Sequence, residues 1–166
     1  MAGLISDLVD VLNEQTQCYN DLILLSEQKK DAIIKNDINA VQSVNGSEST
    51  AIGKSQRIEK KRMELVKDIA EVLNTKEEEL TLRKLLGLIE GQPEYDSLQK
   101  AREDIRKVVH ELKELNERNK VLLNNSLEYI DFSLNVMRSS MDSSLSTYDS
   151  KGQEVDNRRN LFDAKQ

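Results

Sequence analysis

One stretch of the sequence predicts the fold: Glu111-Leu112-Lys113-Glu114-Leu115-Asn116-Glu117-Arg118-Asn119-Lys120-Val121-Leu122-Leu123, in the middle of an apolar stripe. Residues that alternate in steps of three and four form one face of an α-helix that packs lengthwise on another helix. The stripe therefore predicts one long amphipathic helix over about 94–141. Its members are Leu98, Ala101, Ile105, Val108, Leu112, Leu115, Asn119, Leu123, Leu127, Ile130, Leu134, Met137 and Met141.

Asn119 is a polar residue inside this stripe, and it stands where the spacing changes. The steps from Leu115 to Asn119, Leu123 and Leu127 are all of four residues, which realigns a helical seam as a stutter does in a coiled coil. A polar residue at a seam position commonly fixes the register between two helices. We therefore expect Asn119 to set the register, in preference to contacting a ligand.

The composition is that of long helices with solvated outer faces. A third of the 166 residues are charged, 4% are aromatic, and there are one Pro and six Gly. The length allows one domain with a modest core. The formal net charge is −6 and charges of both signs are interspersed, so a nucleic-acid partner is disfavoured because phosphate binding needs clustered Lys and Arg.

Three further helices are predicted before the long one, at about 4–35, 38–73 and 76–90. The second is weakened at 45–53 by residues of low helix propensity, among them Gly46 and Gly53. A break there is the alternative, but we favour a continuous helix because the apolar spacing persists. The fold class is all-α: an elongated antiparallel bundle of three long helices and one short helix.

Two pairs of residues mark helix ends. Asn36 can end the first helix, and Asp37 can cap the second. Thr75 followed by Glu78 is a capping-box pattern, which predicts that Thr75 caps the short helix.

The sequence changes character after Met141. Serines crowd the stretch from Ser139 to Ser150, and few apolar residues follow. This composition predicts a flexible tail at 142–166, attached to a helical bundle at 1–141. The tail retains isolated apolar residues that could act as anchors: Leu145, Tyr148, Val155, Leu161 and Phe162.

Residue patterns typical of catalysis, metal binding or cofactor binding are missing. Cys18 is the only cysteine and His110 the only histidine, and no zinc set, P-loop or nucleophile elbow is present. We expect Cys18 to be a small buried apolar residue. The sequence therefore predicts no catalytic residue, no metal ligand, no cofactor and no enzyme.

One short motif supports a minor alternative. His110-Glu111-Leu112-Lys113 resembles the phosphorylated motif of histidine phosphotransfer domains, which are also helical bundles. That family expects a Gly next, and this chain has Glu114, whose carboxylate would repel a phosphoryl group. A surface histidine is the better interpretation of His110.

The sequence contains no apolar run long enough to cross a membrane, and its N-terminus lacks the pattern of a secretory signal. These features predict a cytoplasmic protein without membrane insertion.

The element Leu115-Asn116-x-x-Asn119-x-x-Leu122-Leu123 resembles the C-terminal half of FlgN-type flagellar export chaperones. The order of the predicted helices also resembles this family. So does the tail, in Thr147-Tyr148-Asp149-Ser150-Lys151-Gly152 and Phe162-Asp163-Ala164-Lys165. Gly46 and Gly53 depart from the family's uninterrupted second helix.

The resemblance implies a function. Such chaperones bind the C-terminal helical segments of the two hook-filament junction (hook-associated) proteins, keep them unassembled and deliver them to the flagellar export gate. An apolar face at the end of the long helix suits helical clients, because amphipathic helices bind in apolar grooves. The candidate client-binding residues are Leu127, Ile130, Leu134, Met137 and Met141, although Leu127 and Ile130 suit packing on the first two helices at least as well.

The resemblance also assigns a role to the tail. In this family the C-terminal region contributes to docking at the export gate. Tyr148 is the principal candidate anchor for docking, since an isolated aromatic side chain supplies a large contact area, and Leu161 and Phe162 are the competing anchor. A structural coiled-coil or adaptor protein without a chaperone cycle remains the alternative to the whole interpretation.

Overall fold

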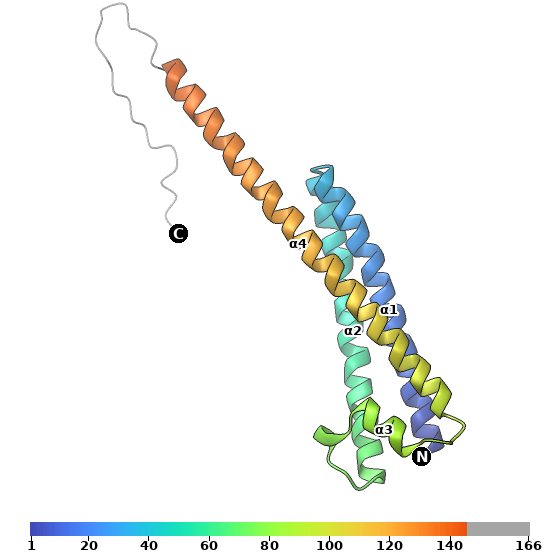
Figure 1. The fold of residues 1–166 in the computed structure, drawn as a ribbon. Coiled ribbons are helices and arrows are strands. Elements are labelled where there is room, and N and C mark those ends of the chain that lie inside the picture. Colours follow the sequence, from blue (N-terminus) through green and yellow to red (C-terminus); the bar gives the residue numbers. More distant parts are fainter. Residues whose placement is uncertain (146–166) are drawn as a thin grey trace, which may run out of the picture. The chain divides into compact units, whose positions relative to one another are not determined.

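The computed structural model describes the backbone of residues 1–145 and the side chains of residues 1–139. It contains helices α1 (Ala2–Ile34), α2 (Ile38–Val72), α3 (Leu82–Leu88) and α4 (Tyr95–Leu145), and a short 3₁₀ helix, η1 (Glu77–Glu79) (Figure 1). No strand occurs within residues 1–145. The predicted all-α fold of three long helices and one short α-helix is therefore confirmed.

The chain divides into two compact units, Met1–Asn124 and Asn125–Gln166. Helix α4 belongs to both, since it runs from Tyr95 to Leu145. The predicted division into a bundle of 1–141 and a tail of 142–166 stays a prediction. Of that tail, residues 142–145 are helical, and 146–166 lie outside the described residues.

The turn between α1 and α2 is built from Asn36 and Asp37. Asn36 takes the left-handed conformation, with φ 53°, and its N–H donates to Ile33 O at 3.0 Å. The N–H of Asp37 donates to Ala32 O at 3.0 Å, which completes a Schellman motif that satisfies the last carbonyls of α1. The Asp37 carboxylate then accepts the N–H of Ala40 and caps α2, as predicted.

Helix α2 is continuous through residues 45–53, as the apolar spacing predicts. Ser47, Ser49 and Thr50 bond through their hydroxyls to backbone carbonyls four residues earlier, so they do not compete with the helix. A Cβ atom added to Gly46 or Gly53 would meet nothing within 4 Å. The glycines lower the propensity of this segment without interrupting it.

The segment after α2 corrects the predicted helix 76–90. Thr75 does not cap a helix, because its N–H bonds to Ala70 O and completes a second Schellman motif around Asn74, whose φ is 50°. Glu77–Glu79 form the 3₁₀ turn η1, and Leu80 then leaves the helical conformation with its side chain buried. The cap is Thr81, whose hydroxyl accepts the N–H of Lys84 and starts α3.

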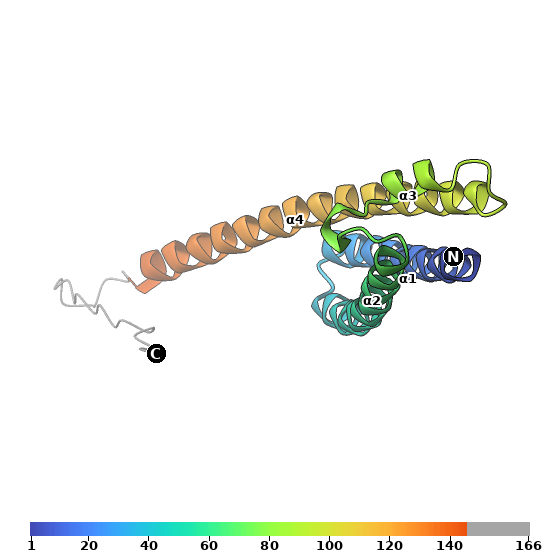
Figure 2. The same cartoon turned by 90° about the horizontal axis from the view of Figure 1, so that it is seen from below.

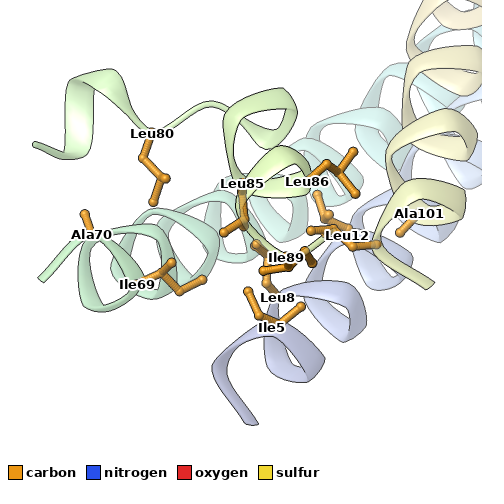
Figure 3. Close-up of a cluster of buried hydrophobic side chains, with 11 residues drawn as sticks. Ile5, Leu8, Leu12, Ile69, Ala70, Leu80, Leu85, Leu86, Ile89 and Ala101 are labelled. Carbon is orange, nitrogen blue, oxygen red and sulfur yellow. The ribbon is translucent and has the colours of Figure 1, made fainter. Parts of the chain in front are cut away.

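Helix α3 closes the core at the end of the bundle where α1 begins and α2 ends. Figure 2 shows α1 and α2 side by side, with α3 on the same side of this pair as the start of α4. Leu85 and Ile89 point from the α3 segment toward Ile5 and Leu8 of α1 (Figure 3). The buried residues of this cluster are Ile5, Leu8, Leu12, Ile69, Ala70, Leu80, Leu85, Leu86, Ile89, Leu98 and Ala101.

A second buried cluster lies further along the α1–α2 pair. It contains Val11, Cys18 and Ile58, with Leu65 packed against it. Cys18 is fully buried, as predicted, and its thiol donates to Ala51 O at 3.5 Å. The first half of α4 contributes the predicted seam to the buried interior, because Leu98, Ala101, Val108, Leu115 and Asn119 are all buried.

Candidate protein-binding surfaces

A small polar layer joins α4 to α1 within residues 1–124. The amide of Asn119 donates to Ser26 O at 2.8 Å, and the Ser26 hydroxyl donates to Asn116 Oδ1 at 3.2 Å. Asn119 is 5% exposed, and its Oδ1 is buried without a hydrogen-bond partner among the described atoms. Directional bonds of this kind disfavour sliding of α4 along α1, as the expected register role requires.

The first candidate surface is the part of α4 that follows this layer. Four of the predicted client-binding side chains are half exposed: Leu127 at 51%, Ile130 at 46%, Leu134 at 47% and Met137 at 60%. Single exposed apolar residues are ordinary on a protein surface, but a contiguous set of this kind marks a binding site. The side chain of Met141 lies outside the described residues, as do Tyr148, Leu161 and Phe162.

A second apolar stripe on the same segment was not among the predicted site residues. Tyr129, Phe132 and Val136 are 68%, 66% and 49% exposed. At about 100° per residue, this stripe lies about 150° around the helix axis from the predicted one. Its own steps of three and four were the available signal in the sequence.

The two stripes are separated differently on the two sides of the helix. Helical periodicity places Glu128, Asp131, Asn135 and Arg138 together on one side, and Ser126 and Ser133 on the other. The serine side is narrow and uncharged, so the two stripes and the serines between them form one broad, mainly apolar surface. We call this surface, formed by residues 126–137 of the second unit, the α4 face.

The second candidate surface is a groove of about 530 Å³ formed by α1, α2 and α4 within residues 1–124. Its α1 side presents Tyr19, Leu22 and Ser26, and its α4 side presents Leu112 and Asn116. The α2 side is the longest and consists of Glu48, Ile52, Ser55, Gln56, Glu59, Lys60 and Met63. We call this feature the bundle groove.

The acidic side chains of the bundle groove are already paired. Glu48 accepts from Lys29 Nζ at 2.5 Å. Glu59 accepts from both Arg62 and Gln15, and the Arg62 hydrogen bond lowers the pKa of the Glu59 carboxyl, with partial burial acting in the opposite direction. Lys60 forms no hydrogen bond or ion pair with the other described side chains.

The described residues show little sign of a metal site, a reactive thiol or a phosphorylated histidine. They contain no group of three or more His, Cys, Asp or Glu placed to hold a metal ion. Burial raises the pKa of the Cys18 thiol, which disfavours the reactive thiolate. His110 is exposed, and its Nε2 lies 3.6 Å from the Glu114 carboxylate, so a phosphoryl group on that nitrogen would meet a negative charge.

No helix in the described part of the chain is both long enough and apolar enough to span a membrane. The comparisons with curated proteins and with solved structures return no match. The family comparison does: the model of the FlgN family, described as FlgN protein, matches residues 1–156.

The chain belongs to the FlgN family. The match spans both candidate surfaces and all the described residues. FlgN-family proteins are chaperones of flagellar assembly, so this chain is a flagellar export chaperone that interacts with flagellar proteins. The resemblance carried by Leu115, Asn116, Asn119, Leu122 and Leu123 is thereby confirmed at the level of the family, and two of these residues form the polar layer between α1 and α4.

Proposed function

We propose that this FlgN-family chain is a cytoplasmic chaperone that binds the C-terminal helical segments of hook-filament junction proteins through the α4 face. The chaperone keeps these clients unassembled and delivers them to the flagellar export gate. The observation that carries the proposal is the concentration of half-exposed apolar side chains in residues 127–137.

The composition of the α4 face suits helical clients. Leucine, isoleucine and methionine side chains adapt to more than one apolar partner, as two different clients require. Tyr129 and Phe132 add aromatic side chains, which are enriched among the residues that dominate binding energy at interfaces. We propose that the client segment is an amphipathic helix. Its apolar stripe packs on the α4 face, so both apolar surfaces are removed from water.

The docking step is assigned to the end of the chain. We propose that Tyr148 anchors the chaperone at the export gate, with Leu161 and Phe162 as the alternative anchor. These residues lie outside the described part of the structure, and the proposal rests on the family and on the isolation of the three side chains in a polar sequence. Pull-downs of Tyr148→Ala and Phe162→Ala with client and the soluble gate domain separate the two anchors, and full binding by both variants would reject them.

The double variant Leu127→Ser/Leu134→Ser tests the client site. Each leucine is about half exposed, so covering what remains contributes about 1 kcal/mol, and loss of both weakens binding by about 30-fold. The affinity is measured by calorimetry against the C-terminal segment of a hook-filament junction protein. The matched control is Leu24→Ser in α1, where the leucine is 63% exposed and outside the α4 face.

Three results would contradict the proposal. Equal loss of affinity in Leu24→Ser and the double variant would show nonspecific apolar binding. Unchanged affinity in the double variant would exclude the predicted stripe, and Tyr129→Ser/Phe132→Ser then tests whether the second stripe binds the client instead. A parent chain that binds no hook-filament junction segment would favour the structural adaptor.

A further inference from the structure

The bundle groove has features of a second docking site, separate from the α4 face. We propose that it binds an amphipathic helix of a partner protein, with carboxylates flanking the apolar stripe of that helix. This inference does not rest on the client-binding proposal, because the groove lies entirely within residues 1–124.

The size and shape of the bundle groove fit a helix. Its α2 wall extends from Glu48 to Met63, which is about 22 Å, or four helical turns. Three helices supply its three sides, so an added helix would take the fourth position of a four-helix bundle. The volume of about 530 Å³ is that of an open depression between ridges of side chains.

Large apolar side chains line the groove without being covered. Ile52 is 48% exposed and Met63 is 53% exposed, one near each end of the α2 wall. Leu22, on the α1 side of the groove, is 8% exposed and is therefore already largely covered. Ile52 and Met63 are eleven residues apart on α2, so an added helix three to four turns long would cover both side chains. The apolar stripe of that helix would contact them.

The charges along the groove determine which charged residues the partner helix carries beside its apolar stripe. Glu48 and Glu59 are paired, whereas the ammonium group of Lys60 forms no ion pair with another described side chain. On α4, Lys113 and Lys120 are exposed and lie about 60° and 40° around the axis from Asn116, on the groove side of Leu112. Both long edges of the groove therefore present lysines, which complement carboxylates and oppose a basic helix.

An adjoining hollow limits where these carboxylates are expected. It shares Met63 with the bundle groove and has a volume of about 290 Å³. Its charged side chains are Arg62, which is paired with Glu59, and the two carboxylates Glu77 and Glu78. The sign of the charge is therefore reversed beyond Met63. The partner helix carries its carboxylates along the part beside Lys60 and Lys113 and has none at the end that reaches Glu77.

Two synthetic amphipathic peptides of about 18 residues test the proposal, because four to five turns match the groove. They share one leucine stripe and differ in having glutamate or lysine at the flanking positions. Fluorescence anisotropy with the full chain is expected to give about tenfold tighter binding of the glutamate peptide. The double variant Lys60→Glu/Lys113→Glu is expected to reverse this preference.

The controls isolate the groove from the rest of the surface. Lys61→Glu/Lys107→Glu makes the same charge change on the same two helices, about 180° from Ile52 and Asn116, and should leave the preference unchanged. Ile52→Asp should abolish binding of the glutamate peptide, whereas Leu127→Ser/Leu134→Ser should retain it. The last comparison also distinguishes failure of this inference from failure of the client-binding proposal.

Three outcomes would overturn the inference. The first is equal affinity for the two peptides, and the second is a preference that Lys60→Glu/Lys113→Glu does not change. The third is self-association of the parent chain that Ile52→Asp abolishes, measured by analytical ultracentrifugation, since a second copy of the chain would then be the occupant.

Discussion

Replacing Gly46 and Gly53 together by alanine is expected to stabilise the chain. Both residues lie inside α2, and a Cβ atom at either would meet nothing within 4 Å, so the methyl groups cost no steric strain. Alanine is favoured over glycine in a helix interior by about 1 kcal/mol, because the unfolded glycine has more conformations to lose. The two positions are about 10 Å apart along the helix, so their effects should add to about 2 kcal/mol.

The assay is urea unfolding followed by far-UV circular dichroism. The unfolding midpoint should rise while the m-value stays unchanged, because the surface exposed on unfolding is the same. The matched control is Gly91→Ala. This position is equally open, but its φ of 80° is strained for alanine, so the same added methyl should destabilise by about 1 kcal/mol. A double variant that is neutral or less stable than the parent would refute the reasoning.

The other predictions concern the core, the polar layer and one carboxylate. Leu85→Ala removes a side chain that is 1% exposed between α1, α2 and α4, and should lower the free energy of unfolding by about 2–5 kcal/mol, measured by urea unfolding. Asn119→Ala removes the hydrogen bond to Ser26 O and should cost about 1–2 kcal/mol in the same assay. The pKa of Glu59 is lowered in the folded state, so its ionised form adds stability above the pKa of the unfolded chain, about 4.3, and loses it as the pH falls through the folded value. Glu59→Gln should therefore flatten the fall of the unfolding midpoint as the pH drops below the pKa of the unfolded chain.

Specific results would contradict each of these. A Leu85→Ala variant as stable as the parent would mean that α3 does not belong to the cooperative core. Asn119→Ala without an effect would show that the polar layer contributes only register. A pH profile that is the same for Glu59→Gln and the parent would exclude a stabilising role for the bond to Arg62.

Helix periodicity predicted most of the fold correctly. The seam from Leu98 to Asn119, the continuity of α2 and the cap at Asp37 follow from local patterns that the packing reinforces. The capping box at Thr75 failed for a physical reason. The N–H of Thr75 is used to end α2 around Asn74, and burial of Leu80 interrupts the next helix, so the cap moves to Thr81.

The binding surfaces were less predictable. The apolar seam of α4 predicts the stripe from Leu127 to Met137, but it does not include the stripe of Tyr129, Phe132 and Val136, which has its own steps of three and four. The bundle groove could not be predicted from the sequence, because Ile52, Leu22 and Leu112 come from three different helices. An apolar residue on a helix stays uncovered when the neighbouring helices lie too far apart to contact it. The periodicity of one helix carries no information on that distance.

Cys18 gives the chain a built-in reporter of its own opening. It is the only cysteine, it is fully buried, and its thiol lies against Ala51 O of α2. A thiol reagent reaches it only when α1 and α2 separate, so the labelling rate under native conditions measures the free energy of that local separation. The same rate, followed as a client or a groove peptide is added, shows whether occupation of either surface slows the opening of the helical pair.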